Sequence, residues 1–147
     1  MTMEKEPFKY STQIRVRNYE VDWQGIVHNA NYLLYFEVGR VEYLKHLGVK
    51  VDLAAIKNES RVVLVRNEID YRSPARFDDL IDVFTRISRI GRTSFQFDGM
   101  ILDAQSGRLV AENVATHVWL SPESGVPIPV SEEFRRKISE FEGSLGV

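Results

Sequence analysis

One stretch of the chain decides its fold: Asn31-Tyr-Leu-Leu-Tyr-Phe-Glu-Val-Gly-Arg-Val-Glu-Tyr-Leu-Lys-His46. Its apolar residues recur at spacings of three and four around most of the circumference, which predicts an α-helix that is buried almost all round. Gly48 follows the last turn, where a left-handed cap is expected, and Asn29 or Asn31 occupies the position of an N-terminal cap. Gly39, in the interior, predicts close packing of the helix backbone against a sheet.

The helix is flanked by segments with the composition of β-strands. Alternation of apolar and polar residues predicts a first strand over residues 13–21, ahead of the helix. After a polar segment, 51–60, stretches rich in Val, Ile, Phe and Thr predict strands over residues 61–71, 80–90, 93–103 and 109–120. The last two connections are short enough for hairpin turns, so a meander is the simplest topology. A short terminal helix is expected from Ser131 onward.

This order of elements predicts an α+β fold, as a single domain over residues 1–147. One long central helix is wrapped by a five-stranded antiparallel sheet and followed by a short C-terminal helix, which is the hot-dog architecture. Because such a sheet cannot close its own edges, we expect edge-to-edge pairing of two sheets in a twofold homodimer, or in a homotetramer.

The composition argues against several classes of function. With 19 basic and 21 acidic residues the formal net charge is −2, so nothing favours nucleic acid or an anionic membrane as a partner. The chain has no cysteine, and its three histidines are too scattered for a zinc site, so we expect no metal and no other cofactor. Residues 1–10 lack the apolar run of a signal peptide or membrane span, so a cytoplasmic location without membrane insertion is expected.

The segment just before the helix carries the candidate chemistry. Asp22 stands ahead of the expected helix start. Since the first N–H groups of a helix lack partners and carry the positive end of its dipole, this start can hold a developing anion. A carboxylate beside an oxyanion site indicates acyl transfer. The alternative is that Asp22 only caps the turn after the first strand.

Several motifs together resemble the 4-hydroxybenzoyl-CoA thioesterase-like branch of the hot-dog thioesterases, which includes the acyl-CoA thioesterases found with Tol-Pal systems. The most specific motif is Asp22-x-x-Gly25-Ile-Val-x-x-x-x-Tyr32 followed by Glu37-x-x-Arg40. Supporting motifs are Tyr71-Arg-Ser-Pro74-x-x-x-Asp78-Asp79, Gly91-Arg-Thr-Ser-Phe95 and Pro127-x-Pro129. The resemblance covers nearly the whole chain. It implies an acyl-CoA thioesterase whose coenzyme A arrives as part of the substrate.

The resemblance also implies roles for the residues of the first motif. The family's catalytic carboxylate matches Asp22, and the residue matching Asn29 lies at the helix N-terminus, where its backbone N–H polarises the thioester carbonyl. Tol-Pal-type enzymes commonly have histidine at that position, but a backbone oxyanion site survives the change. Gly25 and His28 complete the predicted catalytic segment; His28 either orients water or substrate, or is an ordinary polar loop residue. Asp22 can add to the carbonyl or deprotonate a water, and the sequence does not choose between the two.

Other residues are candidates for substrate binding. Tyr32, with Tyr35 and Phe36, either lines an acyl pocket or belongs to the core. The resemblance places the nucleotide phosphates of coenzyme A at the turn between the third and fourth strands, where the candidates are Arg89, Arg92, Thr93 and Ser94; a solvated hairpin tip is the alternative. Glu37 is a rival catalytic carboxylate, because another hot-dog subgroup uses a glutamate of the long helix. An ion pair with Arg40 or with a partner subunit is the favoured explanation of Glu37.

Three functions follow from this sequence. The first is hydrolysis of an acyl-CoA to a free acid and coenzyme A. The second is hydrolysis of acyl groups on acyl carrier protein, which would need a basic docking surface. The third is an acyl-CoA binding module without catalysis. Hydratase activity is less expected, because the histidine-containing motif of hot-dog hydratases is missing.

Overall fold

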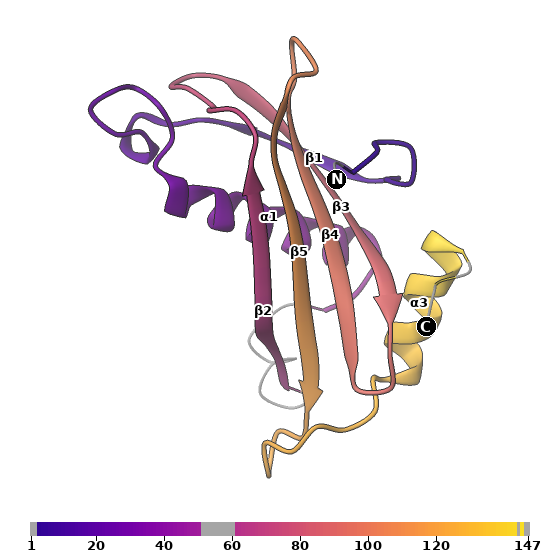
Figure 1. The fold of residues 1–147 in the computed structure, drawn as a ribbon. Helices are drawn as coiled ribbons and strands as arrows, with labels where there is room; N and C mark the ends of the chain where they lie inside the picture. Colours follow the sequence, from indigo (N-terminus) through magenta and orange to yellow (C-terminus); the bar gives the residue numbers. More distant parts are fainter. Residues whose placement is uncertain (1–2, 51–60, 144, 146–147) are drawn as a thin grey trace.

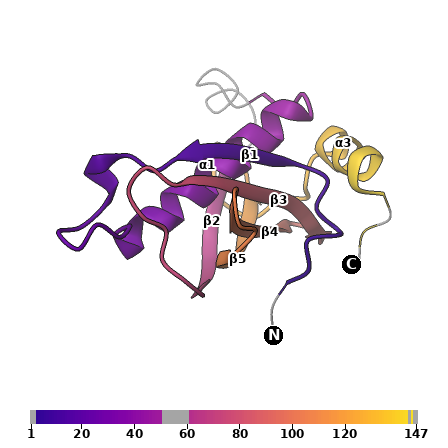
Figure 2. The ribbon, with the colours of Figure 1, turned by 90° about the horizontal axis from the view of Figure 1, so that it is seen from above.

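The computed structural model describes residues 3–50, 61–143 and 145. It contains a five-stranded antiparallel sheet that curves around one long helix, with a short helix near the C-terminus (Figures 1 and 2). The elements are β1 (Ser11–Arg15), η1 (Asn18–Glu20), α1 (Asn29–His46), β2 (Arg61–Tyr71), β3 (Leu80–Ile90), β4 (Ser94–Asp103), β5 (Leu109–Leu120) and α3 (Glu132–Glu142). The predicted hot-dog architecture is confirmed. The predicted polar segment 51–60 lies outside the described residues.

The order of the strands differs from the predicted meander. In the sheet the order is β1-β3-β4-β5-β2, so β3, β4 and β5 form a meander through two hairpins, as expected. β2 instead pairs with β5, and β3 pairs with β1. The long helix separates β1 from β2 in sequence, and the chain crosses from one edge of the sheet to the other through it. β2 is therefore an edge strand.

The first strand is shorter than predicted. It ends at Arg15, and a single 3₁₀ turn, Asn18–Glu20, replaces the end of the predicted strand. The reason is local: the carboxylate of Glu20 accepts a hydrogen bond from the Arg17 backbone N–H at 2.8 Å, which closes the turn and ends the pairing with β3.

The long helix is buried on one side only. Its buried residues, Tyr32, Tyr35, Phe36, Gly39, Arg40 and Tyr43, face the concave side of the sheet. Leu34, Val38 and Val41 are 55, 42 and 38% exposed, so the prediction of a helix buried almost all round is wrong for the single chain. One sheet can cover only one side of a helix, and these three aliphatic side chains lie on the other side.

Both ends of α1 are capped. Gly48 has the expected positive φ of 78°, just after the C-terminal cap. The N-terminal cap is His28 rather than Asn29 or Asn31, since the His28 side chain accepts a hydrogen bond from the Ala30 N–H. The close approach predicted at Gly39 is confirmed. A Cβ atom there would lie 2.7 Å from both Thr85 Oγ1 and Val83 Cγ1.

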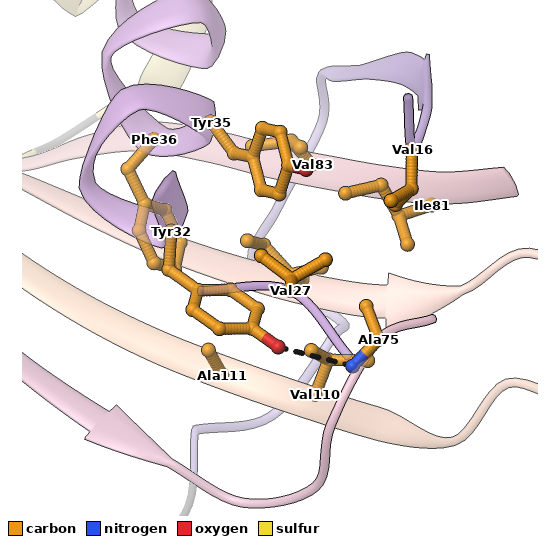
Figure 3. Close-up of a cluster of buried hydrophobic side chains, with 11 residues drawn as sticks. Val16, Val27, Tyr32, Tyr35, Phe36, Ala75, Ile81, Val83, Val110 and Ala111 are labelled. Atoms are coloured by element: carbon orange, nitrogen blue, oxygen red, sulfur yellow. Dashed lines mark hydrogen bonds between the residues drawn. The ribbon is translucent and has the colours of Figure 1, made fainter. Parts of the chain in front are cut away.

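The core has two parts, one at each end of α1. The part at the helix start contains Val16, Val27, Tyr32, Tyr35, Phe36, Ala75, Ile81, Val83, Ile101, Val110 and Ala111 (Figure 3). The other part joins the end of α1 to α3, through residues such as Tyr43, Phe134 and Ile138. The first part fixes the backbone of the segment that carries the candidate chemistry.

A buried histidine gives the fold a specific pH dependence. His117 on β5 stacks against Phe95, and burial, with a smaller contribution from Arg40, lowers the pKa of its imidazole from 6.5 to about 4. In the unfolded chain the imidazole of His117 therefore becomes protonated below pH 6.5, whereas in the folded chain it stays neutral until about pH 4. We expect the free energy of unfolding, measured in urea, to fall over this range, and His117→Phe to weaken that fall. Equal pH dependence in both proteins would contradict this assignment.

Candidate active site

The segment that carries Asp22 is a closed loop tied to the start of α1. Val21 pairs with Val27, and the His28 N–H donates to the Glu20 carbonyl at 3.0 Å. Within the loop the Asp22 N–H donates to the Ile26 carbonyl at 2.9 Å. Residues 22–25 then form a tight turn that requires a positive φ, 81°, at Gly25. Gly25 therefore acts through the shape of this turn.

The carboxylate of Asp22 is held in a defined orientation. One oxygen, Oδ1, accepts a hydrogen bond from the Gln24 N–H at 2.8 Å, which is the turn-capping role considered above. Within the described part of the chain, Oδ2 has no hydrogen-bond partner. The side chain is partly exposed. One oxygen thus orients the carboxylate and the other is available for chemistry.

The start of α1 leaves one backbone donor unused. His28 Nδ1 accepts from the Ala30 N–H at 3.2 Å, and the His28 carbonyl accepts from the Asn31 N–H at 2.9 Å. Among residues 3–50, 61–143 and 145, the Asn29 N–H makes no hydrogen bond. It therefore has the character of an oxyanion donor at the positive end of the helix dipole. Because His28 Nδ1 is an acceptor, a neutral His28 carries its proton on Nε2.

Glu20, which the sequence analysis missed, clamps the Asp22 loop to α1. It is only 7% exposed, and its Oε1 accepts from the Tyr35 hydroxyl at 2.9 Å, while Oε2 accepts from Arg17 Nη2 at 2.6 Å. Its carbonyl also accepts from Asn31 Nδ2 at 2.7 Å. Burial alone would raise the pKa of Glu20, but the hydrogen bonds from Arg17 and Tyr35 outweigh it and lower that pKa. An ionised Glu20 therefore fixes both sides of the site.

Glu20→Gln is expected to lower kcat by about tenfold with little change in KM, because the amide cannot keep every hydrogen bond and Asp22 moves relative to Asn29. Steady-state kinetics with an acyl-CoA measures the effect. Glu140→Gln is the matched control, since Glu140 is exposed on α3 and pairs with Arg136. An unchanged kcat in a less stable Glu20→Gln protein would reduce Glu20 to a folding role.

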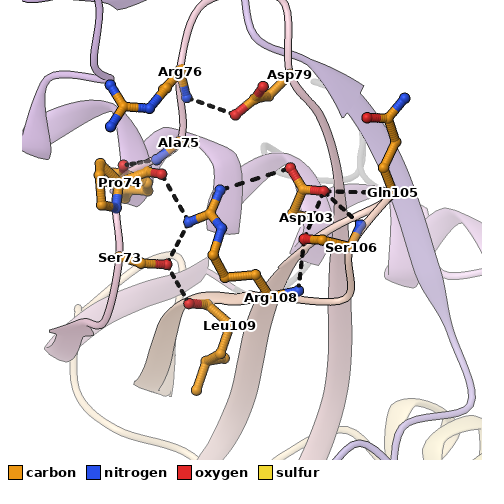
Figure 4. Close-up of polar contacts among 11 residues, drawn as sticks. Ser73, Pro74, Ala75, Arg76, Asp79, Asp103, Gln105, Ser106, Arg108 and Leu109 are labelled. Carbon is orange, nitrogen blue, oxygen red and sulfur yellow. Dashed lines mark hydrogen bonds and ion pairs between the residues drawn. The ribbon is translucent and has the colours of Figure 1, made fainter.

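A second loop, residues 72–79, is hydrogen-bonded to the Asp22 loop. The Val27 N–H donates to the Ala75 carbonyl at 2.9 Å, and the Phe77 N–H donates to the Gly25 carbonyl at 3.1 Å. This loop is itself held by Arg108, which donates to the Pro74 carbonyl at 3.0 Å and also contacts Ser73 and Asp103 (Figure 4). Hydrogen bonds between the two loops therefore fix the backbone of the candidate site.

Trp23, next to Asp22, is 92% exposed at the tip of its loop. Tyr19 and Phe77 are also exposed. An exposed aromatic side chain is therefore the direct sequence neighbour of the candidate carboxylate.

The predicted substrate-binding residues are not gathered at Asp22 in a single chain. Tyr32 is 4% exposed, and its hydroxyl accepts from the Ala75 N–H at 3.0 Å, so it packs in the core beneath the site. Arg89, Arg92, Thr93 and Ser94 lie at or beside the β3–β4 turn, at the far end of β3 from the Asp22 loop. An 11-residue strand spans about 35 Å. Both arginines are exposed at that turn.

Glu37 does not form the expected ion pair with Arg40. Arg40 Nη1 donates instead to Asn113 Oδ1 at 3.3 Å, and Glu37 is exposed. Glu37 also lies about two turns along α1 from Asn29. The role of Glu37 in a partner subunit stays a prediction.

Within the described ranges, no group of three or more His, Asp or Glu residues is placed to hold a metal ion. The described helices include none that is long and apolar enough to cross a membrane.

A hot-dog sheet around a long helix, with a carboxylate loop at the helix start, is the arrangement to which the comparisons below refer. The family model described as the thioesterase-like superfamily matches residues 16–138, and the chain belongs to this family. It is 27% identical to the long-chain acyl-CoA thioesterase FadM of Escherichia coli, over 88% of this chain and 97% of that protein. A chloroplastic acyl-acyl carrier protein thioesterase of Arabidopsis thaliana is 29% identical, over 90% of this chain and 68% of that protein.

Solved structures agree with this membership. A thioesterase from Thermus thermophilus, solved with coenzyme A and Zn, superimposes with a TM-score of 0.80 at 29% identity, covering 95% of this chain and 98% of that one. The protein is therefore an enzyme of the thioester hydrolase class.

Proposed function

We propose that the protein hydrolyses an acyl-CoA thioester to a free carboxylic acid and coenzyme A. The observation that carries the proposal is the Asn29 N–H, which has no hydrogen-bond partner among the described residues. The helix start that presents it is tied through Asn31 to Glu20, next to the loop of Asp22. The thioester carbonyl oxygen binds at this N–H, and Asp22 either attacks the carbonyl carbon or takes a proton from an attacking water. The thiol leaves with a pKa near 8.5, so little acid catalysis is needed.

The proposal includes a homodimer formed through β2. This edge strand exposes Val62, Leu64 and Val65, and Val62 and Leu64 line a hollow with the exposed Val41 of α1. Antiparallel pairing of β2 with its copy would cover this surface and remove the open edge. It would also bring the β3–β4 turn of one subunit to the same end as the partner's Asp22, where Arg89 and Arg92 can bind the phosphates of coenzyme A.

Light scattering at micromolar concentration tests the assembly. The expected mass is at least twice the 17.0 kDa of one chain. A monomeric mass would overturn the dimer, and with it the placement of the phosphates at the partner's β3–β4 turn.

Release of free thiol from a panel of acyl-CoAs, matched with the same acyl groups on acyl carrier protein, tests the activity. The acyl-CoA series is expected to give the higher kcat/KM. Faster turnover of the carrier-protein series would favour the activity named for the Arabidopsis relative. Binding of acyl-CoA without release of thiol would make the protein a binding module.

A further inference from the structure

A hollow lies between α1 and the β2 side of the sheet, away from the Asp22 loop of its own chain. Its volume is about 250 Å³. Val41 and Leu44 of α1 and Val62 and Leu64 of β2 give it aliphatic walls. Two polar side chains, the guanidinium of Arg40 and the imidazole of His117, also line it. An apolar pocket with a few polar groups is typical of a small-molecule site.

Arg40 has more hydrogen-bonding capacity than its surroundings use. It is 8% exposed, yet in the described part of the chain it makes a single hydrogen bond, to Asn113, and no ion pair. Burial lowers the pKa of the guanidinium, and the nearby Glu37 only partly opposes this. Glu37 is itself exposed on the rim, beyond ion-pair distance. A buried guanidinium with unused N–H donors favours an oxygen acceptor as its missing partner.

His117 adds a second unsatisfied group on the sheet side of the same pocket. Its Nδ1 atom is buried and has no hydrogen-bond partner among the described residues. The ring stacks on Phe95 with an interplanar angle of 11°, which fixes its orientation. When the hollow holds no ligand, its two fixed polar groups lack hydrogen-bond partners, which costs free energy. The hollow should therefore favour ligands that supply such a partner over ligands that do not.

We infer that this pocket receives the far end of the acyl group, and that this end carries an oxygen acceptor, as a hydroxyl or a carboxylate. The inference rests on the proposed function, because it assigns the acyl group of that reaction. Arg40 would donate to the acceptor, while the aliphatic walls hold the methylene or aryl part. Acyl groups that end in a methyl would leave Arg40 and His117 unpaired.

The proposed dimer brings the pocket within reach of a catalytic centre. Arg40 lies about 16 Å along α1 from Asn29 of its own chain. In an antiparallel β2 pair, however, the end of β2 that carries Val62 and Leu64 faces the opposite end of the partner's β2. That end carries Tyr71, whose hydroxyl donates to the Asn29 carbonyl at 3.2 Å. The pocket would therefore lie beside the partner's helix start.

The test compares 8-hydroxyoctanoyl-CoA with nonanoyl-CoA, which exchange a hydroxyl for a methyl at equal length, and adds the octanedioic acid monothioester. Shorter and longer pairs extend the series. We expect the wild type to favour the oxygen-ended substrates by at least tenfold in kcat/KM at the best length, and Arg40→Met to bring the ratio close to one. Arg136→Met is the matched control, because Arg136 is exposed on α3, away from the proposed dimer contact, and pairs with Glu140.

Three outcomes separate the inference from the proposed function. Thiol release with no preference for oxygen-ended acyl groups, or a ratio unchanged in folded Arg40→Met, would overturn the inference and leave the hydrolase standing. If Arg40→Met fails to fold, His117→Phe provides the second variant, with an expected severalfold loss of preference. If no thioester is hydrolysed, calorimetric titration with the corresponding non-hydrolysable thioethers measures binding instead. Equal affinities for the oxygen-ended and methyl-ended thioethers would overturn the inference.

Discussion

Asp22→Asn is expected to lower kcat/KM for the best acyl-CoA by about a hundredfold or more. The amide has nearly the same shape as the carboxylate, and its oxygen can still accept the hydrogen bond from the Gln24 N–H, so the turn should persist. What disappears is the charge that makes the second oxygen a nucleophile or a base. The loss should fall mainly on kcat, because an uncharged side chain still allows the thioester to bind.

Asp79→Asn is the matched control for this substitution. Asp79 also accepts a backbone hydrogen bond within a loop, but from an earlier residue, with Oδ2 accepting from the Arg76 N–H at 2.9 Å. It should keep nearly full activity, and both variants should keep the melting temperature of the wild type. Equal loss in the two variants would indicate general electrostatics or loop damage, and full activity in Asp22→Asn would move the catalytic carboxylate elsewhere, first to Glu37.

Gly39→Ala is expected to lower the free energy of unfolding by about 2 kcal/mol, despite the better helix propensity of alanine. The propensity gain is about 1 kcal/mol, whereas overpacking a core costs about 1–3 kcal/mol. The overpacking term should be near its upper end, because the new Cβ would lie 2.7 Å from Thr85 Oγ1 and from Val83 Cγ1. Valine at this position should be worse and should prevent folding at 37 °C.

Gly91→Ala is the comparison for Gly39→Ala. Its added Cβ would approach only the Ser94 hydroxyl within 3.4 Å, at 3.3 Å, and that side chain can rotate. Urea unfolding of the two variants should therefore separate them clearly. Equal stabilities would mean that α1 shifts away from β3 without cost.

The elements of the fold were predictable because their signals are local. The spacing of apolar residues in α1, the β-branched runs of the four later strands and Gly48 at the end of the helix each depend on neighbouring residues in the sequence. Strand pairing is not local: β2 joins β5 across 37 intervening residues of the chain, Arg72 to Arg108. Apolar residues all around α1 were interpreted as burial, although only one side meets this chain's sheet.

The candidate site was predictable in part. Asp22 and Asn29 came from the motif and its place before the helix. Glu20 was missed because alternation suggested a strand residue, whereas its side chain turns inward to Tyr35. Its spacing of three from Arg17 was the available signal. The choice of His28 as cap was equally hidden, since three polar residues stood near the helix start and only the backbone path decided among them.

Trp23 also gives the protein an intrinsic fluorescence signal at the candidate site. The chain has two tryptophans, and Trp119 is buried with 9% exposure, whereas Trp23 stands in water beside Asp22. Indole emission shifts to the blue when solvent is excluded, so docking of an acyl chain at this loop would register as a spectral change from one side chain. Trp119 would supply a constant background, and turnover could then be followed without labelling either the enzyme or its substrate.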